Sequence, residues 1–253
     1  MTAEFDPRDF TPRADELAGR VIAITGPTQG VGRAVALACA KHGANVILVG
    51  RSVPRLEAVH GEIEAAGGQA LIAPLDLEKA VAEGYDTLAA AMLERFGRLD
   101  GLLHNASILG AMSPIEHYDV PTWVRVMHVN VTAAFALTQV LLPALKQSKD
   151  ASVVFTSSSV GRVGRAFWGA YATSKFAIEG LSQVLAAEME NISAIRVNAL
   201  NPGPARTQMR MQAYPSVNPA SMPAPETLVN PYLALLGPAS HGITGRSFDA
   251  QHL

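Results

Sequence analysis

A tyrosine and a lysine, Tyr171 and Lys175, stand four positions apart in the stretch GAYATSKFAIEG (169–180). On a helix this spacing places both side chains on one face, one turn apart. A free phenol has a pKa of about 10, and efficient proton exchange in neutral solution requires a pKa about three units lower. One ammonium about 4 Å away, at an effective dielectric of about 20, supplies the roughly 4 kcal/mol that this shift requires. Aromatic and cationic residues also share ordinary amphipathic faces, so the pair predicts chemistry only with support from the rest of the chain.

A serine and an asparagine extend this candidate site. Ser158 ends the apolar run SVVFTSS (152–158), where a hydroxyl can hydrogen-bond a carbonyl oxygen as charge develops on it. Ser157 and Ser159 are alternatives, and a serine here can also be no more than a polar residue at a strand end. Asn130 lies within the apolar stretch VMHVNVTAAFAL (126–137), where propensity and burial both disfavour it. It therefore either bonds a backbone group or does so while also holding a water molecule.

Short apolar runs alternate with helical stretches from Val21 almost to the end of the chain, and most of the runs lack polar alternation. Such runs are typical of parallel strands covered on both faces. They predict a single-domain Rossmann-like α/β fold, a doubly wound sheet of about seven mostly parallel strands with helices on both faces. The expected strands cover 21–25, 45–50, 70–76, 99–106, 152–158, 195–200 and 243–249, and the expected helices 31–42, 53–66, 80–96, 121–146, 170–190 and 226–236. Gly43 is expected to end the first helix, and Pro121 suits the first turn of the fourth.

Two segments lie outside the alternation. Residues 1–17 are expected to form a loose N-terminal arm before a domain that spans 18–253. Residues 202–225 hold six prolines and no sustained period. A loop this long that follows a strand end predicts a substrate lid, at about 204–225, with a disordered connection as the alternative. Its apolar residues favour an adaptable apolar pocket; they are Met209, Met211, Tyr214 and Met222.

Three glycines, Gly26, Gly30 and Gly32, separate the first expected strand from the first helix in VIAITGPTQGVGRAVALA (21–38). A tight turn, a close backbone approach to a pyrophosphate and a helix N-terminus directed at it all fit this arrangement. Glycines in a strand-to-helix turn can also serve the turn alone. The spacing matches neither the G-x-G-x-x-G fingerprint nor a Walker A loop.

The end of the second expected strand bears on the choice of cofactor. An acid near this point usually holds a ribose 2′-hydroxyl, and an arginine holds a 2′-phosphate. In VILVGRSVPRL (46–56), Gly50 occupies the expected position of the acid, and Arg51 and Ser52 follow it. A guanidinium can bind a phosphate bidentately, so NADP(H) is favoured over NAD(H). The alternative is an arginine that is simply exposed on a loop.

The composition limits the other classes of function. Of 253 residues, 49% are hydrophobic and 17% charged, the net charge is −2, and no dense run of Lys and Arg occurs. Nucleic acid and an anionic membrane are therefore poor candidates for partners. The single cysteine, Cys39, is expected to be buried and reduced.

The N-terminus has no secretion signal and no apolar run of about eighteen residues is evident, so the protein is expected to be cytoplasmic. Seven scattered histidines without an H-E-x-x-H motif argue against a metal site. His104 and His128 are expected to satisfy local polar groups.

Several motifs, in order, resemble those of the short-chain dehydrogenase/reductase family over Leu17 to Gln251. They are TGPTQGVG (25–32), Asp76-Leu77, HNAS (104–107), Asn130, SSS (157–159), YATSK (171–175) and NPGPART (201–207). Two stretches are similar to the YciK-type branch, bacterial reductases of poorly defined substrate: FTSSSVGRVGRAFWGAYATSKFA (155–177) and GRSFDAQ (245–251).

The resemblance implies roles for particular residues. The catalytic residues would be Asn130, Ser158, Tyr171 and Lys175, with Ser158 selected over its neighbours by its spacing from Tyr171. Asn130 would support a water relay to the lysine. At the pyrophosphate and adenosine, the cofactor would be held by Gly26, Thr28, Gln29, Gly30, Val31 and Gly32. Arg51 and Ser52 would bind the 2′-phosphate, and Asp76 and Leu77 the adenine. The ribose and nicotinamide would be bound by Asn105, Ala106, Ser107, Tyr171 and Lys175, and the carboxamide by Pro202, Gly203 and Thr207.

Two departures from the family pattern stand out. Ser107 replaces the usual glycine and adds a side chain near the nicotinamide ribose. The last strand ends FDAQHL in place of Val-Asp-Gly-Gly, which puts the usual C-terminal packing and tetramer interface in doubt. The family, and the surplus apolar residues of the helices at 121–146 and 170–190, nevertheless predict a homodimer or homotetramer.

We therefore expect an NADP(H)-dependent oxidoreductase that reduces a small-molecule carbonyl to an alcohol, or runs the reverse reaction. A regulatory protein that binds NAD(P) on the same fold with little or no turnover is the competing hypothesis. Arg162 and Arg165, just upstream of Tyr171, are either solvated charges or contacts for an acidic substrate or carrier.

Overall fold

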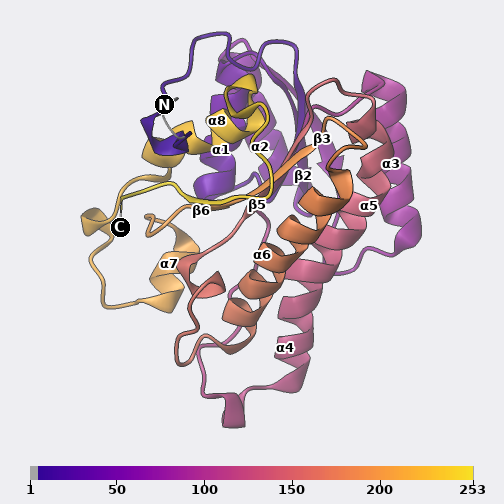
Figure 1. Cartoon of the computed structure of the whole chain (residues 1–253). Helices are drawn as coiled ribbons and strands as arrows, with labels where there is room; N and C mark the ends of the chain where they lie inside the picture. Colours follow the sequence, from indigo (N-terminus) through magenta and orange to yellow (C-terminus); the bar gives the residue numbers. More distant parts are fainter. Residues whose placement is uncertain (1–4, 253) are drawn as a thin grey trace.

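A seven-stranded sheet in the order β3-β2-β1-β4-β5-β6-β7 forms the centre of the molecule, whose computed structural model describes residues 5–252 (Figure 1). Every neighbouring pair of strands is parallel. The strands are β1 Val21–Thr25, β2 Asn45–Gly50, β3 Gln69–Pro74, β4 Gly101–His104, β5 Ser152–Thr156, β6 Arg196–Asn201 and β7 Ser247–Asp249. The order reverses between β1 and β4, where doubly wound sheets form their ligand crevice. The predicted fold class is confirmed.

Helices cover both faces of this sheet. On one face lie α1 Gly30–Lys41, α2 Val53–Ala65 and α8 Asn230–Leu236, and on the other α3 Ala82–Phe96, α5 Ala133–Lys146 and α6 Gly169–Met189 (Figure 1). Within β1, Ile22 and Ile24 pack into the first layer, while Val21 and Ala23 pack into the second. Both sets are buried, which is why the strand sequences show no polar alternation.

Three strands end earlier than the sequence predicted, so the polar residues that follow them lie outside the sheet. The expected strands at 70–76, 99–106 and 152–158 end at Pro74, His104 and Thr156. The residues beyond these ends include Asp76, Asn105 and Ser158, which line a cleft at the carboxyl edge of the sheet.

One predicted helix, at 121–146, is interrupted. It comprises α4 Val120–Met127, a π-helical turn at His128–Thr132, and α5. The start is as expected, with Pro121 in the first turn and the Asp119 carboxylate accepting from the Thr122 amide at 2.8 Å. The π turn contains Asn130, and such turns often mark functional sites.

The whole run Val120–Lys146 is 27 residues long and apolar enough to cross a membrane by length and composition. This corrects the expectation that no such run exists. Leu137, Leu141 and Leu145 on α5 are fully buried in the domain's own core, and a core helix passes the same test of length and composition.

A loose arm was expected at residues 1–17, but residues 5–17 pack against the domain, and residues 1–4 lie outside the described part of the chain. The rings of Phe5 and Phe248 meet edge to face with centroids 5.8 Å apart, and Leu17 is fully buried. A short 3-10 turn, Pro7–Asp9, is capped by the Asp6 side chain and lies against α8.

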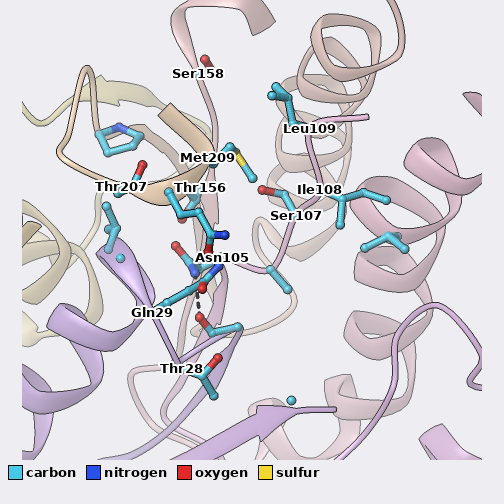
Figure 2. Close-up of a pocket in the computed structure, with 18 of the residues that line it drawn as sticks. Thr28, Gln29, Asn105, Ser107, Ile108, Leu109, Thr156, Ser158, Thr207 and Met209 are labelled. Carbon is cyan, nitrogen blue, oxygen red and sulfur yellow. Dashed lines mark hydrogen bonds between the residues drawn. The ribbon is translucent and has the colours of Figure 1, made fainter. Parts of the chain in front are cut away.

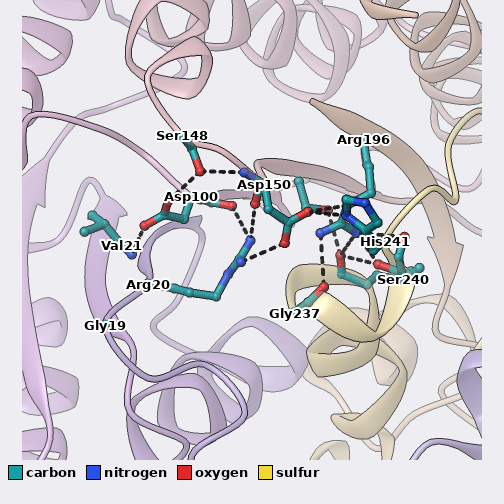
Figure 3. A network of polar contacts seen from close by, with 12 residues as sticks. Gly19, Arg20, Val21, Asp100, Ser148, Asp150, Arg196, Gly237, Ser240 and His241 are labelled. Carbon is teal, nitrogen blue, oxygen red and sulfur yellow. Dashed lines mark hydrogen bonds and ion pairs between the residues drawn. The ribbon is translucent and has the colours of Figure 1, made fainter. Parts of the chain in front are cut away.

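A polar network ties the amino ends of the central strands together (Figure 3). Asp150, just before β5, pairs with Arg20 at 2.9 Å and with the buried Arg196 of β6 at 3.0 Å. Arg196 also donates to the carbonyl of Gly237 at 3.0 Å, and Arg20 to the carbonyl of Asp100 at 2.9 Å. Burial raises the pKa of Asp150, but the two arginines outweigh burial and hold it below its ordinary value. The network therefore fixes the edge of the sheet opposite the cleft.

Candidate active site

A cleft runs along the carboxyl ends of the strands, across the point where the strand order reverses. Every residue predicted for catalysis or cofactor binding lines it except Gly32 and Asn130. Both of these contact residues that do line it, Gly32 against Asn105 and Asn130 against Ile108. The carboxyl edge thus brings together residues from 26 to 207.

The glycine turn between β1 and α1 leaves no room for side chains. Gly26 has φ +65°, and a Cβ there would lie 2.9 Å from the Cα of Ala106. A Cβ on Gly32 would overlap both the Asn105 amide and the Gly26 carbonyl. This close backbone packing opens the N-terminus of α1 to the cleft and fits a dinucleotide pyrophosphate.

The HNAS segment is fastened to this turn (Figure 2). The Thr25 hydroxyl accepts from the amides of Asn105 and Ala106, each at 3.0 Å. The Asn105 side chain donates to the Gly26 carbonyl at 3.2 Å. The floor of the cleft is therefore one hydrogen-bonded unit that joins β1 to β4.

The end of the cleft beside β2 carries a charged cluster. Arg51, Ser52 and Arg55 line it together with Glu78. The Glu78 carboxylate lies 3.6 Å from Arg51 and binds Arg125 through two hydrogen bonds of 2.7 and 2.9 Å. These bonds to Arg125 are the main reason that the pKa of Glu78 is lowered. Glu78 is thus held chiefly by Arg125.

Tyr171 lies in the first turn of α6 with its side chain buried. Burial raises the pKa of the phenol to about 12, although hydrogen bonds with the hydroxyls of Ser158 and Ser107 oppose this. The expected lowering of this pKa by Lys175 is therefore wrong for the protein alone. The Lys175 ammonium is 5.4 Å from the centroid of the tyrosine ring, and desolvation of the phenol dominates.

Lys175 lies one turn further along α6 and is also buried. Its Nζ donates to the carbonyl of Thr156 at 2.8 Å. Burial lowers the pKa of the ammonium to about 8, while the Glu179 carboxylate opposes this change. Tyr171 and Lys175 lie one turn apart on α6, as the sequence predicted, but burial disfavours the charged form of each side chain.

Two of the three serines have distinct partners. The Ser157 hydroxyl donates to Glu179 at 2.5 Å, whereas Ser158 lines the cleft and lowers the pKa of Tyr171. Glu179 also pairs with Arg162 at 3.3 Å. Arg162 in turn binds Asp249 of β7 through hydrogen bonds of 2.9 and 3.0 Å. Neither expectation for Arg162 was right, because it joins the segment after Ser158 to the last strand.

Asn130 hydrogen-bonds the backbone of Ile108, a residue that lines the cleft. Its side-chain oxygen accepts from the Ile108 amide at 2.8 Å, and its side-chain nitrogen donates to the Ile108 carbonyl and the Ser174 hydroxyl, each at 3.0 Å. These bonds explain how an asparagine is accommodated in this apolar helix. Its role in a water relay stays a prediction.

The segment after β6 closes the cleft from the other side. Thr207 caps α7 (Gln208–Ala213) by accepting from the Arg210 amide at 3.2 Å, and its methyl group packs against Gly30. The Gln251 side chain donates to the carbonyls of Pro202 at 2.6 Å and Pro204 at 2.9 Å. This part of the expected lid therefore has regular structure and is not a disordered connection.

Several lining residues were not predicted from the sequence. Arg55, Glu78, Trp168 and Arg210 all face the cleft. Arg55 could have been found, because it lies in the first turn of α2, which begins just after Arg51 and Ser52. The contact between Ser107 and Tyr171 was missed because Ser107 was placed beside the cofactor ribose.

Other titratable groups are structural. His104 stacks on Phe155 with centroids 4.8 Å apart and bonds the Thr138 hydroxyl at 2.8 Å, and burial lowers its pKa to about 3. Cys39 is buried as predicted, and burial raises its pKa to about 12. Across residues 5–252, no group of three or more His, Cys, Asp or Glu side chains is arranged to hold a metal ion.

This fold and this cleft define a protein that binds a dinucleotide beside a tyrosine and a lysine. The chain belongs to the short-chain dehydrogenase family, whose model matches residues 20–218, and the members of this family bind a nicotinamide cofactor. It is of the YciK type. A relative named uncharacterized oxidoreductase YciK, from Escherichia coli (strain K12), is 46% identical over 243 residues, which are 96% of each chain.

Solved structures agree with this assignment. A short chain dehydrogenase from Salmonella enterica serovar Typhi is 47% identical, with a TM-score of 0.94 over 96% of this chain and all of that one. A structure from Escherichia coli CFT073 in complex with NADPH is also 47% identical, with a TM-score of 0.91 over 95% of this chain and all of that one.

Proposed function

We propose that the protein is an NADP(H)-dependent oxidoreductase that reduces a carbonyl to an alcohol, or runs the reverse reaction, with Asn130, Ser158, Tyr171 and Lys175 as its active residues. The observation that carries the proposal is the buried Tyr171 phenol, one helical turn from Lys175, in a cleft that Ser158 also lines and that fits a dinucleotide.

Reduction of a carbonyl requires a hydride at carbon and a proton at oxygen. A bound reduced nicotinamide supplies the hydride. Tyr171 donates its phenolic proton to the substrate oxygen, and the Ser158 hydroxyl donates a hydrogen bond to the same oxygen as negative charge develops. The raised pKa of Tyr171 keeps the phenol protonated until that charge appears.

Lys175 orients the site and handles the proton that Tyr171 must regain. Its bond to the Thr156 carbonyl fixes the ammonium beside the phenol. Because burial brings the pKa of Lys175 to about 8, the ammonium can give up and regain a proton in neutral solution. Asn130 keeps the Ile108 backbone in place and is assigned to the water relay behind the lysine.

The charged end of the cleft supports NADP(H). Arg51, Ser52 and Arg55 can bind a 2′-phosphate, and Gly50 stands where an acid would hold a free 2′-hydroxyl. The related structure from E. coli CFT073, in complex with NADPH, supports the same choice. The pyrophosphate, adenine, ribose, nicotinamide and carboxamide of the cofactor are assigned to the residues that the family resemblance implies for each of them.

The competing hypothesis is a regulatory protein that binds NAD(P) without turnover. It is separated from the enzyme by two measurements on one variant. Tyr171→Phe should abolish NADPH oxidation with every ketone, aldehyde and quinone that the wild type reduces, while NADPH binding followed by fluorescence stays within about twofold.

The matched control is Tyr85→Phe, because Tyr85 is a buried tyrosine of α3 whose hydroxyl has no hydrogen-bond partner within residues 5–252. Turnover that survives in Tyr171→Phe would refute the mechanism. Wild-type protein that binds NADPH but reduces nothing in the panel would favour the regulatory hypothesis.

Assembly, location and the lid complete the proposal. Exposed apolar side chains on the helices from 120 to 189 support a homodimer or homotetramer; they are Val124, Phe135, Phe176 and Val184. Light scattering after gel filtration would test this. We assign the protein to the cytoplasm, and residues 204–225 to a substrate lid that presents Met209 to the cleft.

A further inference from the structure

Next to the catalytic phenol lies a small apolar cluster that is separate from the two main cores. It consists of Leu109, Val160, Trp168, Tyr171 and Ala172, with Met209, Ala213 and Tyr214 packed against them. Leu109 and Met209 are among the side chains that line the cleft (Figure 2). This cluster provides apolar surface for the body of a substrate whose carbonyl meets Tyr171.

Two arginines contact Tyr214 of this cluster. Arg210 of α7 lines the cleft, and its guanidinium carbon is 3.9 Å from the centroid of the Tyr214 ring. Arg165 is exposed and donates to the Tyr214 hydroxyl at 2.7 Å. Tyr214 is therefore held between two positive charges.

The aromatic rings give this charge its position relative to the catalytic group. The Tyr171 and Trp168 ring centroids are 5.7 Å apart, and those of Trp168 and Tyr214 are 5.8 Å apart. The Arg210 guanidinium lies over the Tyr214 ring, the last of these three. Successive ring contacts, from Tyr171 through Trp168 to Tyr214, therefore connect the reacting residue to the ring on which the Arg210 guanidinium lies.

Neither arginine has an acidic partner within ion-pair distance in the described part of the chain. In contrast, Arg51, Arg125 and Arg162 are all paired with carboxylates. The Nε atom of Arg210 is buried and, among residues 5–252, has no hydrogen-bond acceptor. An unpaired buried donor is unfavourable, and a guanidinium binds a carboxylate through two parallel hydrogen bonds.

We propose that the substrate is a carbonyl compound with a carboxylate at the opposite end of an apolar body, and that Arg210 binds this carboxylate, with the charge of Arg165 nearby at the Tyr214 hydroxyl. This inference rests on the proposed carbonyl reduction and adds the substrate class. It also explains the use of arginine at 210, since the planar fork matches a carboxylate and stacks on Tyr214.

The test compares 4-oxo-4-phenylbutanoate with its methyl ester as substrates of the NADPH-loaded enzyme. The wild type should prefer the acid in kcat/KM by about tenfold or more, as expected for a charge-assisted hydrogen bond. Arg210→Gln should lose most of that preference, through the acid and not the ester, and Arg210→Lys should keep part of it. Arg165→Gln should have a smaller effect of about two- to fivefold, because the residue is exposed.

The matched control is Arg95→Gln, which removes one exposed arginine from α3, on a surface outside the cleft. It should leave the preference unchanged. Equal use of acid and ester by the wild type, or an equal loss with both substrates in Arg210→Gln, would overturn the proposal. So would a loss of NADPH affinity in Arg210→Gln as large as the loss with the acid, because Arg210 would then serve the cofactor.

A binding measurement separates this inference from the proposed function. Phenylbutyrate and phenylbutanamide are titrated into the complex with NADPH, and cofactor fluorescence reports binding. Tighter binding of the acid by the wild type, lost in Arg210→Gln, supports the carboxylate site even where neither ketone is reduced. Equal binding of acid and amide by the wild type overturns it.

Discussion

Replacement of Lys175 by methionine should stabilise the folded protein while it abolishes turnover. Lys175 is 3% exposed, and burial lowers its pKa from 10.5 to about 8. A shift of this size corresponds to about 3 kcal/mol of destabilisation at pH 7, because folding must desolvate the ammonium. Methionine has a similar volume and carries no charge.

The lost hydrogen bond works in the opposite direction. Lys175 donates to the Thr156 carbonyl, and a buried acceptor left unpaired costs about 1–3 kcal/mol. The net result at pH 7 should therefore be a gain of about 1 kcal/mol in the free energy of unfolding of Lys175→Met.

The dependence on pH gives the sharper readout. The folded-state pKa of Lys175 lies below the unfolded-state value, so the unfolded chain binds more protons between pH 8 and pH 10.5. Wild-type stability should therefore rise with pH relative to the variant, by about 1 kcal/mol from pH 7 to pH 9. Cys39 also titrates abnormally, but both proteins carry it, so its contribution cancels in the difference.

Urea unfolding followed by circular dichroism, at one protein concentration and at pH 7, 8 and 9, measures both quantities. Lys149→Met, at an exposed lysine, should change stability by no more than about 0.5 kcal/mol at each pH. The reasoning fails if the difference between wild type and Lys175→Met is independent of pH, or if the variant is less stable by more than about 2 kcal/mol at pH 7.

Three further predictions concern the cofactor cleft and the sheet. Arg51→Ala should weaken NADPH binding by about 10- to 100-fold and leave NADH binding within about threefold, as measured by fluorescence titration; equal losses for both would exclude a 2′-phosphate contact. Gly32→Ala should abolish NADPH binding, because the added Cβ overlaps the Asn105 amide. Its control is Gly180→Ala in the middle of α6, where a Cβ meets no other atom; this variant should bind NADPH normally and gain about 0.5–1 kcal/mol of stability. Arg196→Met should cost about 3–5 kcal/mol in urea unfolding, because Asp150 loses a buried partner, and a cost below about 1 kcal/mol would contradict the role given to this pair.

The sequence predicted the elements well because local signals and the sheet agreed. Strands buried on both faces are continuous apolar runs, and stop signals such as Gly43, with φ +92°, act within a few residues. The order of motifs then placed residues from distant parts of the chain along one edge. That step needs only the rule that parallel strands end at the same side.

The features that escaped prediction depend on distances between segments. Nothing near Arg162 in the sequence indicates that it binds Asp249, 87 positions later. The pKa of Tyr171 was predicted in the wrong direction, because the sequence shows the neighbouring charge of Lys175 but not how far burial opposes ionisation of the phenol. The Asn130 side chain likewise bonds the backbone of Ile108, 22 positions earlier, which nothing near Asn130 in the sequence indicates.

The hydrogen bonds between Arg162 and β7 affect the order in which the protein folds during translation. The segment that follows Ser158 is held by Asp249, Ser247 and the Phe248 carbonyl, all of which belong to β7. During translation the earlier strands can pair as they emerge, since domains begin to fold from the N-terminus. The serine segment acquires its anchor only after Asp249 of β7, 87 positions beyond Arg162, has been synthesised. A chain that stops before β7 would therefore hold six of the seven strands while the proposed catalytic serine lacks this support.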